Sequence, residues 1–534
     1  MSRNSLKITT LAATVAASFG ANAALYNVHM SAPEGTSSSL QTYGVAVSDE
    51  TSSCWTTSCG ESTSELAVEV KRYREGFQYR DEAPFFLPFG WNYLDDGYDG
   101  FVSYCRNFLG YQSTQCDIWA DTQYTKGYKK ELDGNYAGSI AYVDGGVVKS
   151  EINTVVNTLS GLSGSTSVVG SAQDTSITSH RSFKGFVDTT DFTTGDSEVI
   201  SAQYWTQKAL TPTTDTFIVG SIIRDNVSVG NKFIYTSKPT IWKNGTANEI
   251  NWFGNRTENG DSKAQGSVRD IIEGDPKTTL YGVGYTSDGD VRLKAAVFKS
   301  TDSGDNWTTQ LVGNFPYESS EYANQTLQAV NDNGIAVGTA KLNRALSGAY
   351  ANTLFYVDNL ESPSYKAFSG DIFFTGANGK AGAINNNDEV VGTIDYERHS
   401  ETNGNPRAKR GFIAPLTGNA KAPLQGKAWY LDDLTYGSNA ATDNNQFRII
   451  EAADINDAGV IAATAYYCAG GWDSEAINAS CNAGASLVAV ELVPIQGATS
   501  ISARPVEQET VSRKGGSLGW FILPLLGLLG FRRK

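Results

Sequence analysis

One phrase of sequence recurs along this chain, and its clearest copy is AVNDNGIAVGT at residues 329–339. It returns as AINNNDEVVGT at residues 383–393 and, in degraded form, as DINDAGVIAAT at residues 454–464. Each copy is a turn rich in Asn, Asp and Gly that runs into a short strand of β-branched residues. The repeat therefore predicts an all-β protein built from strands that tight turns connect.

Weaker copies keep only the end of the strand. They lie at residues 167–170, 217–220 and 281–284, and residues 43–47 form a candidate further copy. A second phrase follows most copies, an apolar strand that often ends in an aromatic residue. It occurs at residues 184–187, 239–242, 295–298, 353–356 and 410–413. Two alternating strand phrases predict several strands in each repeat unit.

Together the two phrases resemble the HAF-type extracellular repeat, which runs roughly I-N-x-x-G-x-V-V-G and then A-F-x-W. The resemblance covers about residues 150–495. A β-rich period of about 50–70 residues indicates stacked or circularly arranged sheets. A unit of several strands favours a β-propeller over a solenoid. We expect a propeller over residues 24–495 with six or seven blades, and seven is the preferred number.

Residues 300–307 read STDSGDNW and match the Asp-box, S-x-D-x-G-x-x-W. In families that carry this motif it is a hairpin turn on a propeller blade. The resemblance implies that Asp302 accepts backbone N–H groups within the turn and that Trp307 packs against the blade. It implies a structural role for the motif.

The two ends of the repeat region are both predicted strands. Residues 25–30 (LYNVHM) alternate in polarity, and residues 486–493 (SLVAVELV) form the last apolar run. If these two strands pair in one sheet, the ring closes and no sheet edge stays exposed.

Residues 49–136 interrupt the repeat, and we interpret them as a disulfide-pinned, partly helical insertion in the first blade. Residues 64–75 have the apolar spacing of a helix. The aromatic side chains of this insertion are the candidate binding site, because aromatic faces stack on sugars and anchor interfaces. They are Phe85, Phe86, Phe89, Trp91, Tyr93 and Trp119. The alternative is that these rings fill the core of the insertion.

The six cysteines lie in three local pairs: Cys54 and Cys59, Cys105 and Cys116, and Cys468 and Cys481. Six cysteines permit 15 pairings, so the sequence fixes none of them. We expect neighbours to pair, each bridge closing one loop. A zinc site is the alternative, but the spacings lack the paired C-x₂₋₄-C pattern.

The N-terminus has the features of a secretory signal peptide. Residues 1–23 contain Arg3 and Lys7, an apolar stretch from Ile8 to Phe19, and the small-residue site 21–23. This order predicts cleavage by signal peptidase between Ala23 and Ala24. A retained membrane anchor is the alternative, but the apolar run is short for one.

The C-terminus carries a three-part signal. Gly515 and Gly516 precede an apolar run at residues 521–531, expected as a short hydrophobic helix, and a basic tip at residues 532–534. The segment 515–534 resembles the GlyGly-CTERM tail of exported Gram-negative proteins. In that family a rhomboid-type protease, a rhombosortase, cuts near the glycine pair and the product moves to the cell surface. A permanent anchor is the alternative. Residues 496–514 are polar, and we interpret them as a spacer.

The charge of the chain argues against some partners. The formal net charge is −15. It becomes about −20 when the basic residues of the two terminal segments are removed, and such a surface disfavours nucleic acid and anionic lipid. No cofactor is expected. Calcium could be held by the Asn- and Asp-rich turns or by the acidic stretch 95–100, but the EF-hand spacing fails there and a turn is the preferred interpretation.

Taken whole, the chain resembles a gammaproteobacterial family of exported proteins that combine HAF-like repeats with a GlyGly-CTERM tail. The resemblance implies a location and a fold but no activity. Our first hypothesis is a surface-displayed propeller that binds a protein or polysaccharide partner. The alternatives are an extracellular glycan- or peptide-processing hydrolase and a structural envelope protein. Clustered carboxylates and arginines in a central funnel would favour the hydrolase, and a closed or apolar funnel the other two.

Overall fold

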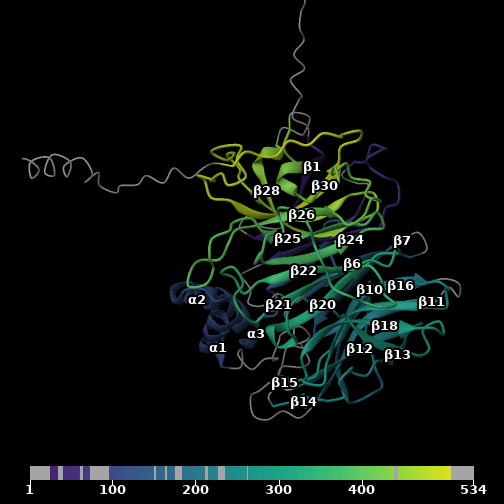
Figure 1. The fold of residues 1–534 in the computed structure, drawn as a ribbon. Helices are drawn as coiled ribbons and strands as arrows, with labels where there is room; N and C mark the ends of the chain where they lie inside the picture. Colours follow the sequence, from purple (N-terminus) through teal and green to yellow (C-terminus); the bar gives the residue numbers. More distant parts are fainter. Residues whose placement is uncertain are drawn as a thin grey trace, which may run out of the picture.

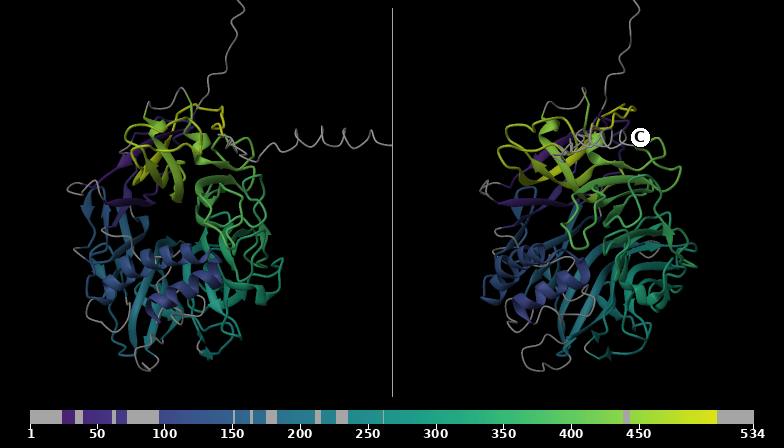
Figure 2. Two further views of the ribbon diagram at one scale, coloured as in Figure 1. Left: turned by 90° about the vertical axis from the view of Figure 1, so that its left-hand side faces the viewer. Right: turned by 60° about the vertical axis from the view of Figure 1, so that its left-hand side comes forward.

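The computed structural model describes residues 24–33, 40–60, 64–71, 96–149, 152–162, 165–174, 183–210, 215–225, 235–260, 262–437 and 443–506 of the 534-residue chain. Within these residues the strands form seven four-stranded antiparallel sheets and one two-stranded hairpin. The sheets are arranged radially around an axis (Figures 1 and 2). The predicted β-propeller is confirmed, and its number of blades is seven.

We number the blades I–VII in chain order. Blade I holds β2 (Gln41–Val47), β3 (Leu66–Lys71), β4 (Ser139–Val143) and β5 (Gly146–Val147). Blade II holds β6 (Thr154–Leu162), β7 (Ser165–Gln173), β8 (Phe183–Val187) and β9 (Thr190–Asp191). Blade III holds β10 (Val199–Leu210), β11 (Asp215–Asp225), β12 (Tyr235–Lys243) and β13 (Thr246–Glu249). The hairpin of β14 (Glu258–Asn259) and β15 (Ser262–Lys263) follows.

Blade IV holds β16 (Ser267–Glu273), β17 (Leu280–Ser287), β18 (Leu293–Ser300) and β19 (Thr308–Leu311). Blade V holds β20 (Tyr322–Val330), β21 (Ala336–Leu342), β22 (Asn352–Val357) and β23 (Lys366–Ala367). Blade VI holds β24 (Gly379–Ile384), β25 (Glu389–Asp395), β26 (Lys409–Pro415) and β27 (Trp429–Tyr430). Blade VII holds β28 (Phe447–Ile455), β29 (Ile461–Tyr467), β30 (Ser486–Pro494) and β1 (Tyr26–Ser31).

The ring closes as predicted. Strand β1 pairs antiparallel with β30, with Tyr26 opposite Pro494 and Met30 opposite Val490. Leu25, Tyr26 and Val28 are buried in the apolar cluster shared by blades VI and VII. The N-terminal strand thus completes the sheet that the C-terminal strands begin.

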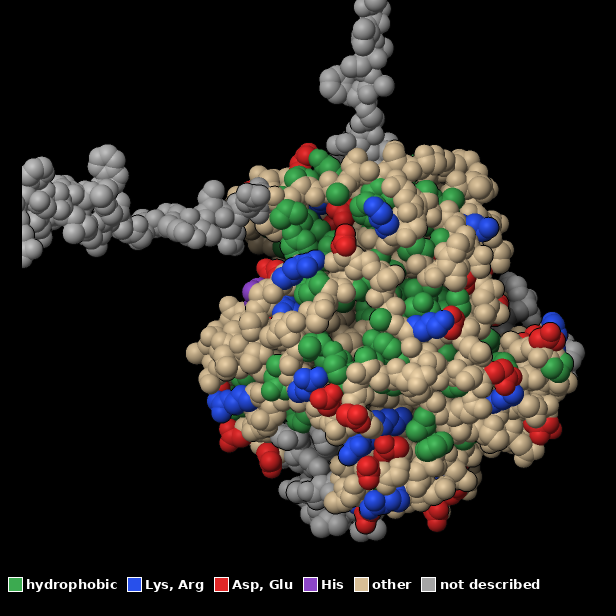
Figure 3. Space-filling model, in the orientation of Figure 1, with side chains coloured by type: hydrophobic (Ala, Val, Ile, Leu, Met, Phe, Trp, Pro, Cys, Tyr) green, Lys and Arg blue, Asp and Glu red, His purple; other side chains and the backbone are tan. Residues whose placement is uncertain are grey.

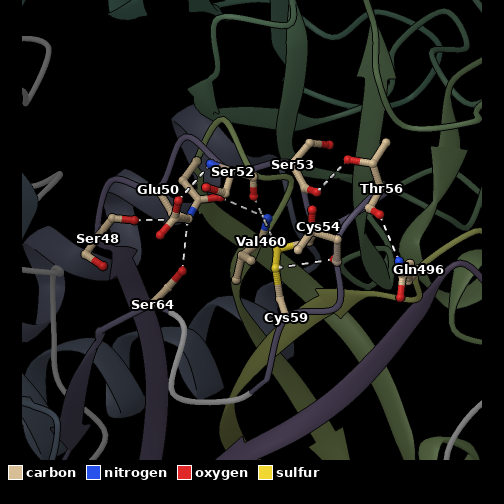
Figure 4. The surroundings of a disulfide bond; sticks show 12 residues. Ser48, Glu50, Ser52, Ser53, Cys54, Thr56, Cys59, Ser64, Val460 and Gln496 are labelled. Carbon is tan, nitrogen blue, oxygen red and sulfur yellow. Dashed lines mark hydrogen bonds between the residues drawn. A yellow bond between two sulfur atoms is a disulfide. The ribbon is translucent and has the colours of Figure 1, made fainter.

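The first disulfide loop reinforces this joint. Cys54 and Cys59 are bonded (Figure 4). The Cys54 backbone N–H donates to the Ala458 carbonyl of blade VII at 3.1 Å. The Trp55 ring meets the Tyr26 ring edge-on, with centroids 5.2 Å apart. Gln496 Nε2 donates to the Thr56 carbonyl at 2.8 Å. This loop therefore contacts both the first strand, β1, and the segment that follows β30. The other two predicted disulfides, Cys105–Cys116 and Cys468–Cys481, are present as well.

The structure explains the glycine of the V-V-G phrase. In blades II, V and VI this glycine lies on the second strand, at Gly170, Gly338 and Gly392. A Cβ at Gly392 would collide with the Lys380 carbonyl of the first strand and lie 2.9 Å from the Phe412 ring of the third. The aromatic residue of the second phrase packs over the glycine, and the two phrases are consecutive strands of one blade.

The asparagine of the repeat links neighbouring blades. Asn331, Asn385 and Asn456 each begin a turn between the first and second strands, and each side-chain oxygen accepts the N–H four residues on, at 3.0–3.1 Å. Their amide groups donate across the blade boundary, from Asn331 to the Asn385 carbonyl and from Asn385 to the Asn456 carbonyl, at 2.9 and 3.0 Å. Asn456 donates in the same way to the Ser48 carbonyl at 3.0 Å. The recurring phrase encodes the contacts between blades as well as the strands.

The Asp-box has the predicted structural role in the β18–β19 hairpin. Asp302 Oδ1 accepts the Asn306 N–H at 2.9 Å, and Trp307 is half-buried against the apolar cluster of blades III and IV. Hydrogen bonds from the Asn306 side chain and N–H lower the pKa of Asp302 to about 2.

Three sequence predictions need correction. The helix predicted over residues 64–75 is instead strand β3, because Leu66–Lys71 is buried on both faces and pairs with β2 and β4. Residues 43–47 lie on the first strand of blade I, not on a second strand. The acidic stretch near residue 97 begins a helix rather than forming a plain turn.

Helical structure within the insertion lies between β3 and β4. It comprises α1 (Gly97–Tyr104), η1 (Cys105–Leu109), α2 (Ser113–Ala120), η2 (Asp121–Tyr128) and α3 (Lys129–Leu132). Three shorter elements lie elsewhere: α4 (Leu431–Leu434), η3 (Ser319–Glu321) and η4 (Asn444–Gln446). Because the insertion joins a second strand to a third, it leaves the ring at the end opposite the Asn turns. We call the end of the ring where the insertion leaves it the cap end, and the end with the Asn turns the turn end.

The segment after β30 is anchored to the propeller. Arg504 is buried, and its backbone N–H donates to Asp433 Oδ1 at 2.8 Å while Nε donates to the Asp432 carbonyl at 3.0 Å. The Ile477 N–H donates to the Pro505 carbonyl at 2.9 Å. Residues 496–506 of the expected spacer thus lie against blades VI and VII.

Candidate functional site

The first strands of all seven blades line one cavity on the propeller axis. Its volume is about 570 Å³, and its lining includes residues of β2, β6, β10, β16, β20, β24 and β28. Each of these strands has a register irregularity against its second strand. A β-bulge re-aims the local side chain. The seven irregularities occur at comparable places in the seven strands, and residues at all of them line this axial channel.

Carboxylates gather where the channel meets the turn end. They are Asp49, Asp270, Asp332, Asp454 and Asp457. Lys208 lies among them and forms an ion pair with Asp270 at 2.8 Å. The other lining cations, Lys71, Arg269 and Lys380, lie farther toward the cap end on their strands. The channel mouth at the turn end is therefore acidic.

Two of these carboxylates have a structural task. Asp270 accepts the Val330 N–H of the next blade at 3.0 Å, and Asp454 accepts the Val47 N–H of the next blade at 3.0 Å. Each also accepts the N–H of the isoleucine that follows it, at 2.8 and 2.9 Å. Burial raises the pKa of Asp454 to about 6 against the effect of these hydrogen bonds, and the charges of Asp49 and Asp270 add to the rise.

Asp49 makes fewer hydrogen bonds to the backbone than Asp270 and Asp454 do. Its Oδ2 accepts the Gly161 N–H at 2.9 Å. The side chain is accessible to solvent, yet it lies inside the concave mouth, where surrounding protein limits its hydration and raises its pKa. Across the mouth, the Asn386 amide bridges Asp332 and Asp457, with 3.0 Å to an oxygen of each. Asp49 is thus a channel carboxylate that could act on a ligand.

Several residues that line the channel have buried polar side-chain atoms without partners. Among the described residues no hydrogen-bond partner lies within reach of Ser160 Oγ, Trp205 Nε1, Gln207 Oε1 or Thr464 Oγ1. These four residues line the channel and are 8% exposed or less. The Arg269 guanidinium lies 3.4 Å from the centre of the Trp205 ring. These four atoms have almost no exposed surface, so a ligand in the channel does not reach them directly.

The helical insertion lies over the cap end. In the left view of Figure 2 its helices cross the face of the ring. Phe101 and Tyr128 pack with Tyr285 of blade IV. On the far side the Gln112 N–H donates to the Gly404 carbonyl of blade VI at 3.0 Å. The insertion is thus anchored to blades on both sides of the axis and crosses part of the cap end.

Lys341 is buried near these cap contacts, and it gives a prediction for pH. Burial lowers its pKa to about 7, and Lys409 lowers it further against the opposing charge of Glu401. Lysine in an unfolded chain titrates near 10.4, so the unfolded state binds more protons between about pH 7 and 10 and the free energy of unfolding rises with pH there. We expect Lys341→Met to abolish that rise and to stabilise the protein by about 2 kcal/mol at pH 6.

Urea unfolding between pH 6 and 10 measures this effect, with the exposed Lys427→Met as the control. Parallel stability curves for Lys341→Met and wild type would contradict the assignment.

The structure places only part of the candidate aromatic site. Trp119 is half-buried in the insertion, stacked on Tyr104 with centroids 5.8 Å apart and tilted against Phe101 at 6.0 Å. Ala24 is buried at the start of the closing strand. The expected C-terminal helix lies outside the described residues, as do the remaining aromatic candidates and processing-site residues, which are Phe85, Phe86, Phe89, Trp91, Tyr93, Ala23, Gly515 and Gly516.

Metal ligands and membrane-spanning helices are both absent from the described ranges. No three His, Cys, Asp or Glu side chains there gather so that they could hold a metal ion. No helix within those ranges is long and apolar enough to cross a bilayer. On the face seen in Figure 3, acidic and basic side chains are interspersed.

The channel was not predicted from the sequence. The repeat phrase at residues 329–339, 383–393 and 454–464 contributes part of the lining, but nothing in the phrase shows that these residues surround one axis. A signal was present, because Arg269-Asp270-Ile271 and Ala453-Asp454-Ile455 share an Asp-Ile pair at equivalent places in blades IV and VII. The axial channel, the central funnel of the sequence analysis, is neither closed nor apolar. Carboxylates cluster in it, but Arg269 is the one arginine among its described lining residues.

Fold and site together define a seven-bladed β-propeller with a polar axial channel and a helical cap. The chain belongs to the family described as "Protein of unknown function (DUF3466)", which matches residues 257–534. No curated protein matches it.

Among solved structures, the chain is similar to a protein of unknown function from Dyadobacter fermentans, with 10% identity, 88% of this chain and 100% of that chain covered, and a TM-score of 0.36. It is similar to an α-L-arabinanase from Penicillium chrysogenum, with 9% identity, coverage of 61% and 89%, and a TM-score of 0.32. It is also similar to a sialidase from Trypanosoma rangeli, with 10% identity, coverage of 64% and 56%, and a TM-score of 0.30. At these values none of them carries an argument about function.

Proposed function

We propose that this protein is an exported, surface-displayed propeller that binds a segment of polysaccharide in its axial channel. The observation that carries the proposal is the polar channel of about 570 Å³, which all seven blades line. Cavities of roughly 300–1,000 Å³ are typical of sites for small ligands. A few sugar rings fit such a volume, whereas a folded protein partner does not.

The insertion crosses part of the cap end, so we propose that the ligand enters from the turn end. The first-to-second strand turns surround that mouth, and the Asn links join those of blades V, VI and VII to one another and to blade I. A mouth held in place by its neighbours loses little conformational freedom when a ligand binds, which favours affinity.

The proposed location rests on the two terminal segments of the sequence. Signal peptidase would cut before Ala24, and a rhomboid-type protease would cut near Gly515 and Gly516 after transient anchoring in the membrane. The termini of protein recovered from the cell surface test this. Recovery of peptides from residues 520–531 in that fraction would contradict the cleavage.

A channel-blocking variant tests the binding function. Ala453 is half-buried at the bulge of β28 and lines the channel, so Ala453→Trp should obstruct it. A ligand at 100 times its Kd stabilises the native state by about 2.7 kcal/mol. We expect surface polysaccharides to raise the unfolding temperature of the wild type and not that of Ala453→Trp. Val147→Trp, on the outer strand of blade I where Val147 is exposed, is the control and should respond like wild type.

If polysaccharides stabilise Ala453→Trp as they stabilise the control, the channel is not the binding site.

A hydrolase is the second candidate, and the carboxylates at the mouth favour it. Asp49 has a raised pKa and an oxygen not committed to the Gly161 N–H, which suits a general acid. Asp270 and Asp454 hold backbone N–H groups, as a structural role requires. Release of reducing ends from a bound polysaccharide, lost in Asp49→Asn while binding persists, would make this propeller a hydrolase.

A further inference from the structure

The charge of the channel points to the chemical class of its ligand. We infer that the ligand is a glycan of amino sugars whose free amino groups are positively charged, and that the carboxylates at the turn-end mouth bind these groups. This inference rests on the proposed function and deepens it, because it names the class of polysaccharide that the channel takes.

Acidic side chains are concentrated in the channel. Eight of the 43 residues that line it are Asp or Glu, compared with 57 of 534 in the whole chain. Four of the 43 are Lys or Arg, compared with 42 of 534. The lining is thus enriched in acids and hardly in bases, and its formal charge is −4. A cleft lined by one sign of charge attracts ligands of the opposite sign.

Most of this charge lies at the turn end, within reach of a ligand. Asp49 and Asp332 are exposed there, and Glu50 and Asp457 are half-buried. Among the described lining residues, Lys208 is the one base at this end. The carboxylates of the mouth are those of Asp49, Glu50, Asp270, Asp332, Asp454 and Asp457.

The mouth already holds one ammonium group, that of Lys208. Its Nζ lies 2.8 Å from Asp270 Oδ1. Burial alone would lower the pKa of Lys208, yet the charges of Asp270, Asp332 and Asp49 raise it above its usual value. The protonated amine is therefore favoured here although it loses hydration. The mouth has six carboxylates and this one ammonium group, so it keeps negative charge for the amino groups of a ligand.

The open side of the channel leads to these carboxylates. At the level of the β-bulges, Trp205 of blade III is only 5% exposed, whereas Ala383 and Ala453 of blades VI and VII are half-buried and accessible. The turns of blades V and VII, which flank blade VI, carry Asp332 and Asp457. A chain of sugar rings that lies against the small side chains therefore passes both carboxylates as it leaves the channel.

Two substitutions remove charge from the mouth and keep the shape of the side chain. Asp332→Asn and Glu50→Gln each retain an oxygen for the hydrogen bond that the carboxylate accepts, from Asn386 Nδ2 and from the Ser52 N–H. Glu318→Gln is the matched control, because Glu318 is exposed and does not line the channel.

The test uses full-length mature protein at pH 6 and hexamers of glucosamine, N-acetylglucosamine, glucuronic acid and lysine. The first two share one backbone and differ only in the acetyl group that removes the charge. Calorimetric titration should show the glucosamine hexamer binding tenfold or more tightly than the acetylated one, with an affinity that falls as salt is added.

The variants should change the Kd of the glucosamine hexamer in opposite directions. Asp332→Asn and Glu50→Gln combined should weaken it about threefold or more. Lys208→Met removes the competing ammonium group and should tighten it, which a general folding defect cannot do. Glu318→Gln should leave Kd unchanged, and thermal unfolding without probe confirms that each variant is folded.

Other outcomes overturn the inference. Equal or tighter binding of the acetylated or the acidic hexamer would exclude a cationic sugar, and equal weakening by Glu318→Gln would exclude the mouth carboxylates as contacts. If a surface polysaccharide binds the wild type but not Ala453→Trp, and the glucosamine hexamer does not bind, the proposed function stands and this inference is wrong. Tighter binding of hexalysine than of every sugar would replace the glycan by a cationic peptide and overturn both. If neither polysaccharide nor probe binds, the proposed function fails and the inference falls with it.

Discussion

Removal of residues 24–32 from the mature chain should leave a protein that no longer unfolds cooperatively, or that unfolds at a much lower temperature. The deletion exposes the edge of β30 and the apolar surface that Leu25, Tyr26 and Val28 cover. Burial of each such side chain contributes about 1.5–3 kcal/mol, so the loss is about 5 kcal/mol or more. A whole domain is stable by only about 5–15 kcal/mol. Calorimetry of the truncated protein measures the effect.

A point variant and a rescue separate ring closure from a general defect. Met30 is on the same strand but is 48% exposed, so Met30→Gln should unfold like wild type. A peptide spanning residues 24–33 should restore part of the stability when added in trans, because it can pair with the free edge of β30. If the truncated protein kept the wild-type unfolding temperature, β1 would be dispensable for closure.

Gly392→Val should strongly destabilise the repeat. Any Cβ at this position collides with the Lys380 carbonyl and presses on the Phe412 ring. The first of these obstacles is backbone and cannot rotate away. Overpacking of this kind typically costs about 1–3 kcal/mol, and a backbone collision lies at or above the upper end. Urea unfolding should show a lower midpoint, and the Asn links between blades should loosen as β24 and β25 separate.

Gly418→Val is the matched control. Gly418 is an exposed glycine of the same blade, and a Cβ there would meet nothing within 4 Å. It should change the free energy of unfolding by less than about 0.5 kcal/mol. Equal effects of the two substitutions would show that the carbonyl contact does not explain the repeat glycine.

Much of the fold follows from the sequence because the repeat phrases encode contacts that recur. The asparagine turn, the glycine that admits a carbonyl and the aromatic that covers it occupy fixed positions in blades V and VI, at Asn331, Gly338 and Phe355 and at their counterparts. Ring closure followed from two terminal runs of strand character that had no other partner.

Residues 64–75 were predicted wrongly because two patterns overlap. Leu66, Val68 and Val70 alternate with Glu69 and Lys71, yet Ala67 and the neighbouring charges also suit one face of a helix. The strand forms because β2 and β4 pair with its two edges, while blades VII and II bury its two faces. Glu69 and Lys71 are tolerated there because they pair with each other at 3.1 Å.

The channel could not be predicted because its residues are brought together only by closure of the ring. Ser160, Gln207 and Thr464 are up to about 300 residues apart, and of the three only Thr464 lies in a copy of the repeat phrase. Their chemistry is visible only as hydrogen bonds that the fold leaves unmade. Such a deficit has no signature in a single sequence.

The anchoring of Arg504 has a mechanical consequence. A pull along the chain at Val506 reaches Arg504 before it reaches β30, and there it meets the hydrogen bonds to Asp432 and Asp433. These bonds join the chain to the connection between β27 and β28, so tension spreads into two blades and does not peel the closing strand from its edge. The hydrogen bonds of Arg504 therefore protect the pairing of strand β30 from a force applied to the chain beyond Val506.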